Sequence, residues 1–159
     1  MQYEISFLPL DPYFVPTQDA AGKATEILES YFEFGDYDVE IETFSEPHFF
    51  STPDCWEFIV CPECKQKAAI GRSELWDDLI SVAESAKNAL THQVQMPCCG
   101  KNIPLKCLDF EYVFGKTAAI ARFRVSLNDI DPDEVEESLI TDIELVLGCK
   151  VVQVIGGTT

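Results

Sequence analysis

The pattern of apolar and polar residues predicts four strands and two helices outside the middle of the chain. Apolar side chains recur at nearly every second position in three stretches: 3–8, 37–44 and 119–125. The fourth strand is predicted at 150–155, with the sequence KVVQVI. A helical spacing of apolar residues begins at Thr17 or Gln18 and runs toward Gly35, where glycine favours a helix end. A second helical spacing covers residues 132–147.

The last helix carries the clearest signals at its ends. Asp131 is a preferred N-cap residue, Pro132 suits the first helical position, and Glu134 completes a capping box. Gly148 favours termination. We therefore expect a helix over residues 132–147.

The order of these elements predicts an α+β fold of the ferredoxin-like, or split βαβ, type. In that arrangement both helices cover one face of an antiparallel sheet. We expect a single domain over 1–159, with a scaffold formed by residues 1–50 and 116–159 and an inserted module at 51–115. The stretch 45–54 is rich in proline and serine, which predicts a loop. The expected scaffold core consists of Ile5, Phe7, Leu28, Ile41, Phe123, Leu139, Ile143 and Val152.

The inserted segment contains two cysteine turns that suit one metal ion. Cys61 and Cys64 frame a Cys-Pro-Glu-Cys turn, and Cys98 and Cys99 lie on a Pro-Cys-Cys-Gly turn. A CxxC turn can aim both sulfurs at a point about 2.3 Å away, and four thiolates suit tetrahedral zinc. The sequence therefore predicts a zinc-ribbon-like module that holds one structural Zn²⁺ through these four residues.

Two further residues near the turns are alternative zinc ligands. Cys98 and Cys99 are adjacent, and adjacent ligands strain the backbone more than a CxxC turn does. Cys107 and His92 are therefore the expected substitutes if the two adjacent cysteines cannot both bind. Ser73 is predicted to cap a helix between the two turns, because the apolar residues that follow it have the helical period.

The composition indicates a soluble, acidic, cytoplasmic protein. The net charge is −17, from 28 acidic and 11 basic residues, and within 61–107 the two signs nearly cancel. The remaining surface repels nucleic acid at long range, so charge favours a basic protein as partner. The odd count of 7 cysteines argues against a disulfide framework. No apolar run approaches the ~20 residues that a membrane helix needs.

The cysteine turns support three hypotheses for function. A closed four-thiolate site leaves no position for a catalytic water, which favours a non-enzymatic interaction protein. A thiol-redox enzyme that uses Cys61 and Cys64 is one alternative, because this CxxC follows a predicted strand at 56–60. A metal-dependent hydrolase is the other, with three thiolates and His92 or water on the zinc and Glu63 as the base.

Two groups of polar residues outside the module are expected to be structural. Arg122 and Arg124 alternate with an apolar residue on a predicted strand, and we expect them to face Glu40 or Glu42 across the sheet. An anion site is the alternative for these arginines. No nucleophile or paired carboxylate lies near His48 in the sequence, so we expect it to be a surface or packing residue.

A set of short motifs spread over most of the chain carries a family resemblance. These motifs are Asp11-Pro12, Val15-Pro16, the CPEC and PCCG turns with a helix between them, Ala121-Arg122-Phe123 and Leu147-Gly148-Cys149. Their combination resembles a family of small uncharacterised bacterial cytoplasmic proteins with CPxC and PCCG zinc-knuckle motifs. The resemblance implies no activity. Lys65 follows the CPEC turn, where a zinc ribbon typically has glycine to ease the backbone after a ligand.

Overall fold

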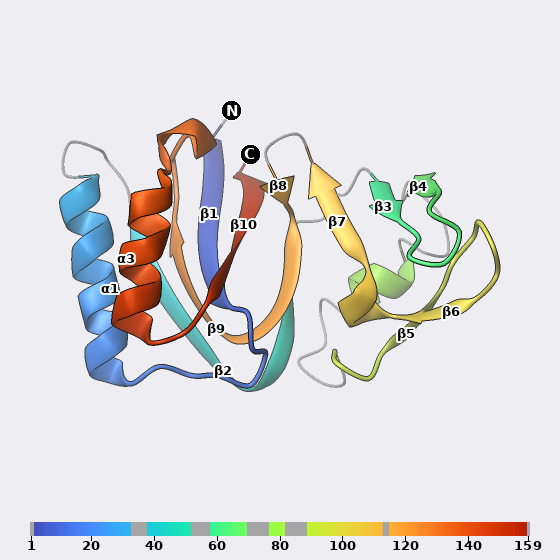
Figure 1. Cartoon of the computed structure of the whole chain (residues 1–159), viewed down its shortest axis with the longest axis horizontal. Helices are drawn as coiled ribbons and strands as arrows, with labels where there is room; N and C mark the ends of the chain where they lie inside the picture. Colours follow the sequence, from blue (N-terminus) through green and yellow to red (C-terminus); the bar gives the residue numbers. More distant parts are fainter. Residues whose placement is uncertain are drawn as a thin grey trace.

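The structure, a computed structural model, describes residues 2–32, 38–51, 58–69, 77–81, 89–112 and 115–158. A four-stranded sheet with the order β10-β1-β9-β2 forms the scaffold, and all its neighbouring strands are antiparallel (Figure 1). The scaffold elements are β1 (Gln2–Pro9), α1 (Gln18–Tyr31), β2 (Val39–Ser51), β9 (Ala118–Leu127), α3 (Glu137–Leu147) and β10 (Val151–Thr158). The fold is therefore α+β, as the sequence predicts.

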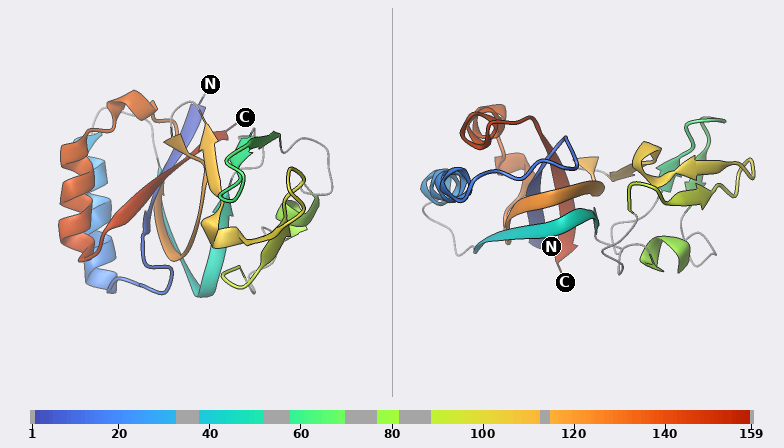
Figure 2. Two further views of the ribbon diagram at one scale, coloured as in Figure 1. Left: turned by 45° about the vertical axis from the view of Figure 1, so that its right-hand side comes forward. Right: turned by 90° about the horizontal axis from the view of Figure 1, so that it is seen from below.

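Helices α1 and α3 lie side by side on one face of this sheet (Figure 2). Thr17 caps α1, because its hydroxyl accepts a hydrogen bond from the backbone N–H of Ala20. The core between helices and sheet consists of Ile5, Phe7, Ala21, Ala24, Leu28, Phe123, Val125, Leu127, Ile130, Leu139, Ile143 and Leu147. Ile41, which the sequence placed in this core, is 42% exposed. It lies on β2, the edge strand of the sheet, where fewer neighbours cover it.

Strand β2 is longer than the sequence predicted, and the expected loop at 45–54 is wrong for the part that the structure describes. The strand pairs with β9 up to Thr43, passes through an irregularity, and pairs again from His48 to Ser51. Pro47 lies inside the irregularity, where its missing N–H removes no bond of the ladder. Pairing with β9 thus overrides the local loop signal.

The predicted start of the last helix is also wrong. Asp131 caps a short 3₁₀ turn, η3 (Pro132–Glu134), by accepting from the backbone N–H of Asp133. The chain is then extended at Val135 and Glu136, and the α-helix begins at Glu137. The extended step lets Val135 pack against the core, so burial of an apolar side chain outweighs continuation of the helix.

The middle of the chain forms two further small sheets, drawn on the right of Figure 1. Their elements are β3 (Phe58–Val60), β4 (Lys67–Ala69), β5 (Gln93–Gln95), β6 (Asn102–Pro104), η2 (Leu105–Cys107), β7 (Asp109–Tyr112) and β8 (Gly115–Lys116). One sheet has the order β4-β3-β7-β8, and the other is the hairpin β5-β6. Residues 77–81 are helical, whereas most of the helix predicted from Ser73 lies outside the described residues.

These small sheets share a core with the scaffold. The core of this region includes Phe49 of β2, which is 2% exposed and whose ring centroid lies 5.6 Å from that of Phe110 on β7. Ala118 and Ile120 of β9 pack against the same cluster. In the part of the chain that the structure describes, no helix is long and apolar enough to cross a membrane.

Candidate metal centre

The four predicted zinc ligands lie on two β-hairpin turns with the same backbone hydrogen bonds. Residues 61–66 connect β3 to β4, and residues 96–101 connect β5 to β6. In the first turn the N–H of Cys61 donates to the carbonyl of Gln66 over 3.0 Å, and that of Lys65 donates to the carbonyl of Cys61 over 2.9 Å. In the second turn the N–H of Met96 donates to the carbonyl of Lys101 over 2.9 Å, and that of Gly100 donates to the carbonyl of Met96 over 2.8 Å.

The fifth position of both turns has a left-handed backbone. Lys65 has φ +62° and Gly100 has φ +72°. Glycine adopts this conformation without a steric penalty, whereas a residue with a Cβ atom pays for it in free energy. The absence of glycine after the first turn, noted in the sequence, therefore coincides with an observed unfavourable conformation.

The turns bring the sulfurs of Cys61, Cys64, Cys98 and Cys99 to within 4.8 Å of one another. The Sγ atoms of Cys61 and Cys99 are 3.8 Å apart, and those of Cys64 and Cys98 are 3.3 Å apart. Four sulfurs at about 2.3 Å from a tetrahedral zinc would be separated by about 3.8 Å, the edge of that tetrahedron. The cluster can therefore accept a metal ion with small movements of its side chains.

Hydrogen bonds within the cluster separate the acidities of its thiols. The backbone N–H of Cys64 donates to the sulfur of Cys61 and lowers the pKa of Cys61 to about 7. Hydrogen bonding to the sulfur of Cys64 raises the pKa of Cys98 to about 12. A coordinated metal ion deprotonates its thiol ligands outright, so an ion bound here would hold Cys98 as a thiolate.

The alternative ligands named from the sequence lie elsewhere. The Nε2 atom of His92 is 3.1 Å from Oδ1 of Asp78, and this side chain is outside the sulfur cluster. Cys107 is exposed on η2 and also lies outside the cluster. Glu63, the base of the hydrolase hypothesis, pairs with Lys101 at 3.3 Å. The geometry thus groups the four cysteines of the first assignment.

The predicted arginine pairs lie on the sheet face opposite the helices. Arg124 forms ion pairs with Glu4 of β1 and Glu42 of β2, so it joins three neighbouring strands. Arg122 donates from Nε to the carbonyl oxygen of Phe44 over 2.9 Å. The prediction of a structural role is confirmed for Arg124, and Arg122 bonds to backbone instead of to a carboxylate.

His48 packs in the same region, as expected. Its ring stacks on Phe44 at a centroid distance of 4.4 Å and meets Phe50 edge-on at 4.9 Å. Burial lowers the pKa of His48, with a smaller opposing contribution from Glu42. A neutral imidazole between two phenyl rings is consistent with a packing role.

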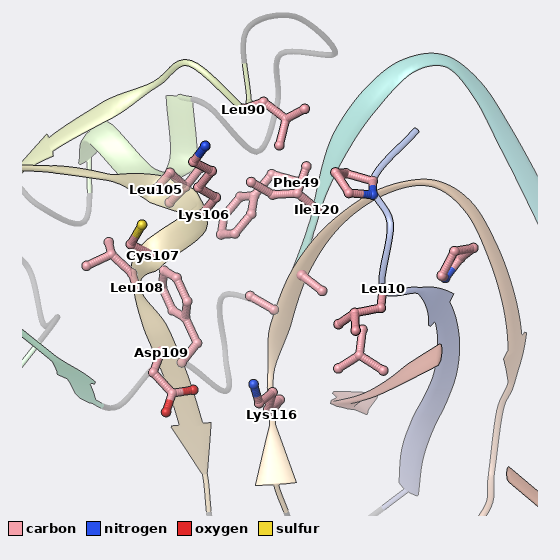
Figure 3. A pocket seen from close by; sticks show the side chains of 16 residues that line it. Leu10, Phe49, Leu90, Leu105, Lys106, Cys107, Leu108, Asp109, Lys116 and Ile120 are labelled. Carbon is pink, nitrogen blue, oxygen red and sulfur yellow. The ribbon is translucent and has the colours of Figure 1, made fainter. Parts of the chain in front are cut away.

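A groove of about 370 Å³ separates the scaffold from the small sheets. Most of its lining is apolar, including Phe49, Ile120 and Leu10, and the last of these is 66% exposed. Lys106 and Lys116 lie at opposite ends of the groove (Figure 3). Within the described residues neither lysine makes an ion pair. The carboxylate of Asp109 also lines the groove, so its polar side chains carry both signs of charge.

Sequence reasoning missed the equivalence of the two turns. Their residue numbers differ by 35, so Met96 occupies the position of Cys61, and Cys98 that of Glu63. The shared proline at the second position and cysteine at the fourth were the available signal.

Comparison with protein family models, with curated proteins and with solved structures found no match for this chain. The family resemblance drawn from the motifs stays a prediction.

Proposed function

We propose that this protein is a non-enzymatic, zinc-stapled interaction protein. One structural Zn²⁺ would be bound by Cys61, Cys64, Cys98 and Cys99 and would hold the two hairpins together. The observation that carries the proposal is the grouping of four thiol sulfurs within 4.8 Å. Four thiolates fill a tetrahedral zinc and supply much negative charge to it, so the metal stabilises structure and is a poor Lewis acid.

The contacts of the remaining polar residues support a non-catalytic site. His92 and Glu63, the groups that a hydrolase would need beside the metal, pair with Asp78 and Lys101. The thiol-redox alternative needs a helix that begins at the CxxC motif to stabilise a reactive thiolate. Here Cys61 and Cys64 lie on a hairpin turn between β3 and β4, with no helix starting at the motif.

We further infer that the scaffold is a ferredoxin-like, split βαβ sheet into which a zinc-ribbon-like module is inserted. The strand order β10-β1-β9-β2 supports this assignment, since the first and fourth scaffold strands are neighbours and the third lies between the first and second. Two hairpins with equivalent turns support the zinc-ribbon-like assignment. A module this small needs a metal to supply part of its stability.

The proposed partner is a basic protein in the cytoplasm. The net charge of −17 supports this inference, and α3 presents exposed carboxylates at Glu137 and Asp142. The negative charge of this protein raises the rate of encounter with a basic partner and repels polyanions.

The decisive experiment measures metal and thiols on the same sample. Protein purified without added metal is analysed for zinc by mass spectrometry and for accessible thiols by alkylation, before and after chelation. We expect one zinc per chain and the protection of four thiols that chelation removes. A zinc-free protein with a Cys61–Cys64 disulfide would instead support the thiol-redox alternative.

A further inference from the structure

The two turns of the metal centre present their cysteines at different positions. In the first turn the thiols stand at positions one and four, as Cys61 and Cys64. In the second turn they stand at positions three and four, as Cys98 and Cys99, and position one is Met96. The two turns have the same backbone hydrogen bonds and the same strand register, so their positions one to six are structurally equivalent.

In the first turn the side chain at position three lies outside the sulfur cluster. In the first turn this position is Glu63, whose side chain is 50% exposed and pairs with Lys101. Met96, at position one of the second turn, has no exposed surface and belongs to the core of the small sheets. Cys98 therefore supplies the fourth sulfur from the position that the half-exposed Glu63 occupies in the first turn.

We propose that Cys98 is a displaced, exchangeable ligand through which the centre passes its zinc to an incoming thiolate. This inference rests on the proposed structural zinc and adds how that zinc is released. Cys61, Cys64 and Cys99 occupy ligand positions that the turns themselves define, and they hold the ion. Cys98 stands at position three, which supplies no ligand in the first turn. It is therefore the first ligand to leave the zinc.

The exchange step conserves charge and protons. The Zn–S bond to Cys98 breaks, and its thiolate takes up the proton that the incoming thiol gives up. The incoming thiol loses a proton and forms the new Zn–S bond. The acceptor is defined chemically as a protein or small molecule that carries thiols, and it needs to reach Cys98, which is only half-buried.

The test compares four forms of the full chain loaded with zinc: the wild type, Cys98→Ser, Met96→Cys, and the double variant Met96→Cys/Cys98→Ser. Zinc affinity is measured by competition with a chelator, and the rate of transfer by mixing with a chromophoric dithiol. We expect Cys98→Ser to weaken binding by more than about tenfold in the wild type and by less than about threefold in the Met96→Cys background. We expect the double variant to release zinc at least about tenfold more slowly than the wild type.

Met96→Leu is the matched control, because it keeps the apolar volume and removes the sulfur. It should leave affinity and transfer rate unchanged, and it should not rescue Cys98→Ser. Cobalt substitution checks the ligands directly, since its thiolate charge-transfer spectrum should have equal intensity in the wild type and in the double variant.

Several outcomes overturn the inference. Cys98→Ser with wild-type affinity shows that Cys98 is not a ligand, and weakened binding in Met96→Leu shows that the thioether is one. Equal transfer rates for the wild type and the double variant show that Cys98 is not the leaving ligand. A wild-type protein that binds no zinc overturns the proposed function as well, so the stoichiometry separates the two failures.

Discussion

Substitution of Lys65 by glycine should tighten zinc binding. Lys65 holds φ at +62° in the fifth position of the first turn, and Gly100 holds φ at +72° at the same position of the second. A left-handed backbone costs a residue with a Cβ atom about 1–2 kcal/mol. Glycine avoids this cost but loses about 0.5–1 kcal/mol more conformational entropy on folding. The difference between these two ranges is about 0–1.5 kcal/mol, with a central value of about 0.7 kcal/mol.

The gain appears in zinc affinity because a structural metal site forms together with the segment that supplies its ligands. The central value of about 0.7 kcal/mol corresponds to about a threefold lower dissociation constant. The assay is competition between the protein and a chelator of known affinity at fixed pH. Fixed pH is needed because each thiol ligand releases its proton when it binds zinc.

Two companion variants make the reasoning refutable. Gly100→Ala should weaken binding by a similar factor, and the cost should come from the backbone, because an added Cβ atom meets nothing within 4 Å. Gln66 is next to Lys65 but has no positive φ. Gln66→Gly should therefore weaken binding, since it only increases the conformational entropy that the chain loses on folding. If Lys65→Gly weakened zinc binding as much as Gln66→Gly does, the left-handed conformation would not be a source of strain.

Three further predictions concern the scaffold and the other thiols. Chelation should remove hydrogen-exchange protection from β3, β5 and β6 and leave α3 protected. The reason is that the core between the helices and the scaffold sheet contains no residue between 58 and 112. Loss of protection in α3 would show that zinc holds the whole fold. Arg124→Met should lower the free energy of unfolding by about 1–3 kcal/mol, because Glu4 and Glu42 lose a shared partner, and an unchanged denaturation midpoint would contradict this. In the zinc-loaded protein iodoacetamide should modify the exposed Cys107 before Cys149. Burial, and to a smaller extent the charge of Glu144, raises the pKa of Cys149. Peptide mass spectrometry at pH 8 measures the order of modification.

The sequence predicted three of the scaffold strands because their apolar and polar side chains alternate, as expected for a sheet with one face buried. It failed where pairing with another strand decided the outcome. The 45–54 stretch has the composition of a loop, and β2 continues through Pro47 to Ser51 because β9 offers a partner. The Asp131 side chain does cap a turn, but it is a 3₁₀ turn, since burial of Val135 redirects the chain.

The metal site was predictable as a set of residues but not as a geometry. Cysteine spacing named the four sulfurs that the fold brings together. It also left His92 as an alternative, and only the folded chain shows that this side chain contacts Asp78. The role of Met96 could not be read from cysteine spacing, because the comparison that reveals it depends on strand register and on backbone hydrogen bonds.

The second half of β2 limits how this protein can be dissected. A fragment cut at the predicted borders 51 and 115 would lack Phe49, Ala118 and Ile120, all of which pack in the core of the small sheets. The surface left bare would be apolar, and exposed apolar patches promote aggregation. The complementary fragment would carry Phe49 into solvent, so each half needs the other for its solubility. Transplanting the module into another protein would therefore require the strand pair β2 and β9 to move with it.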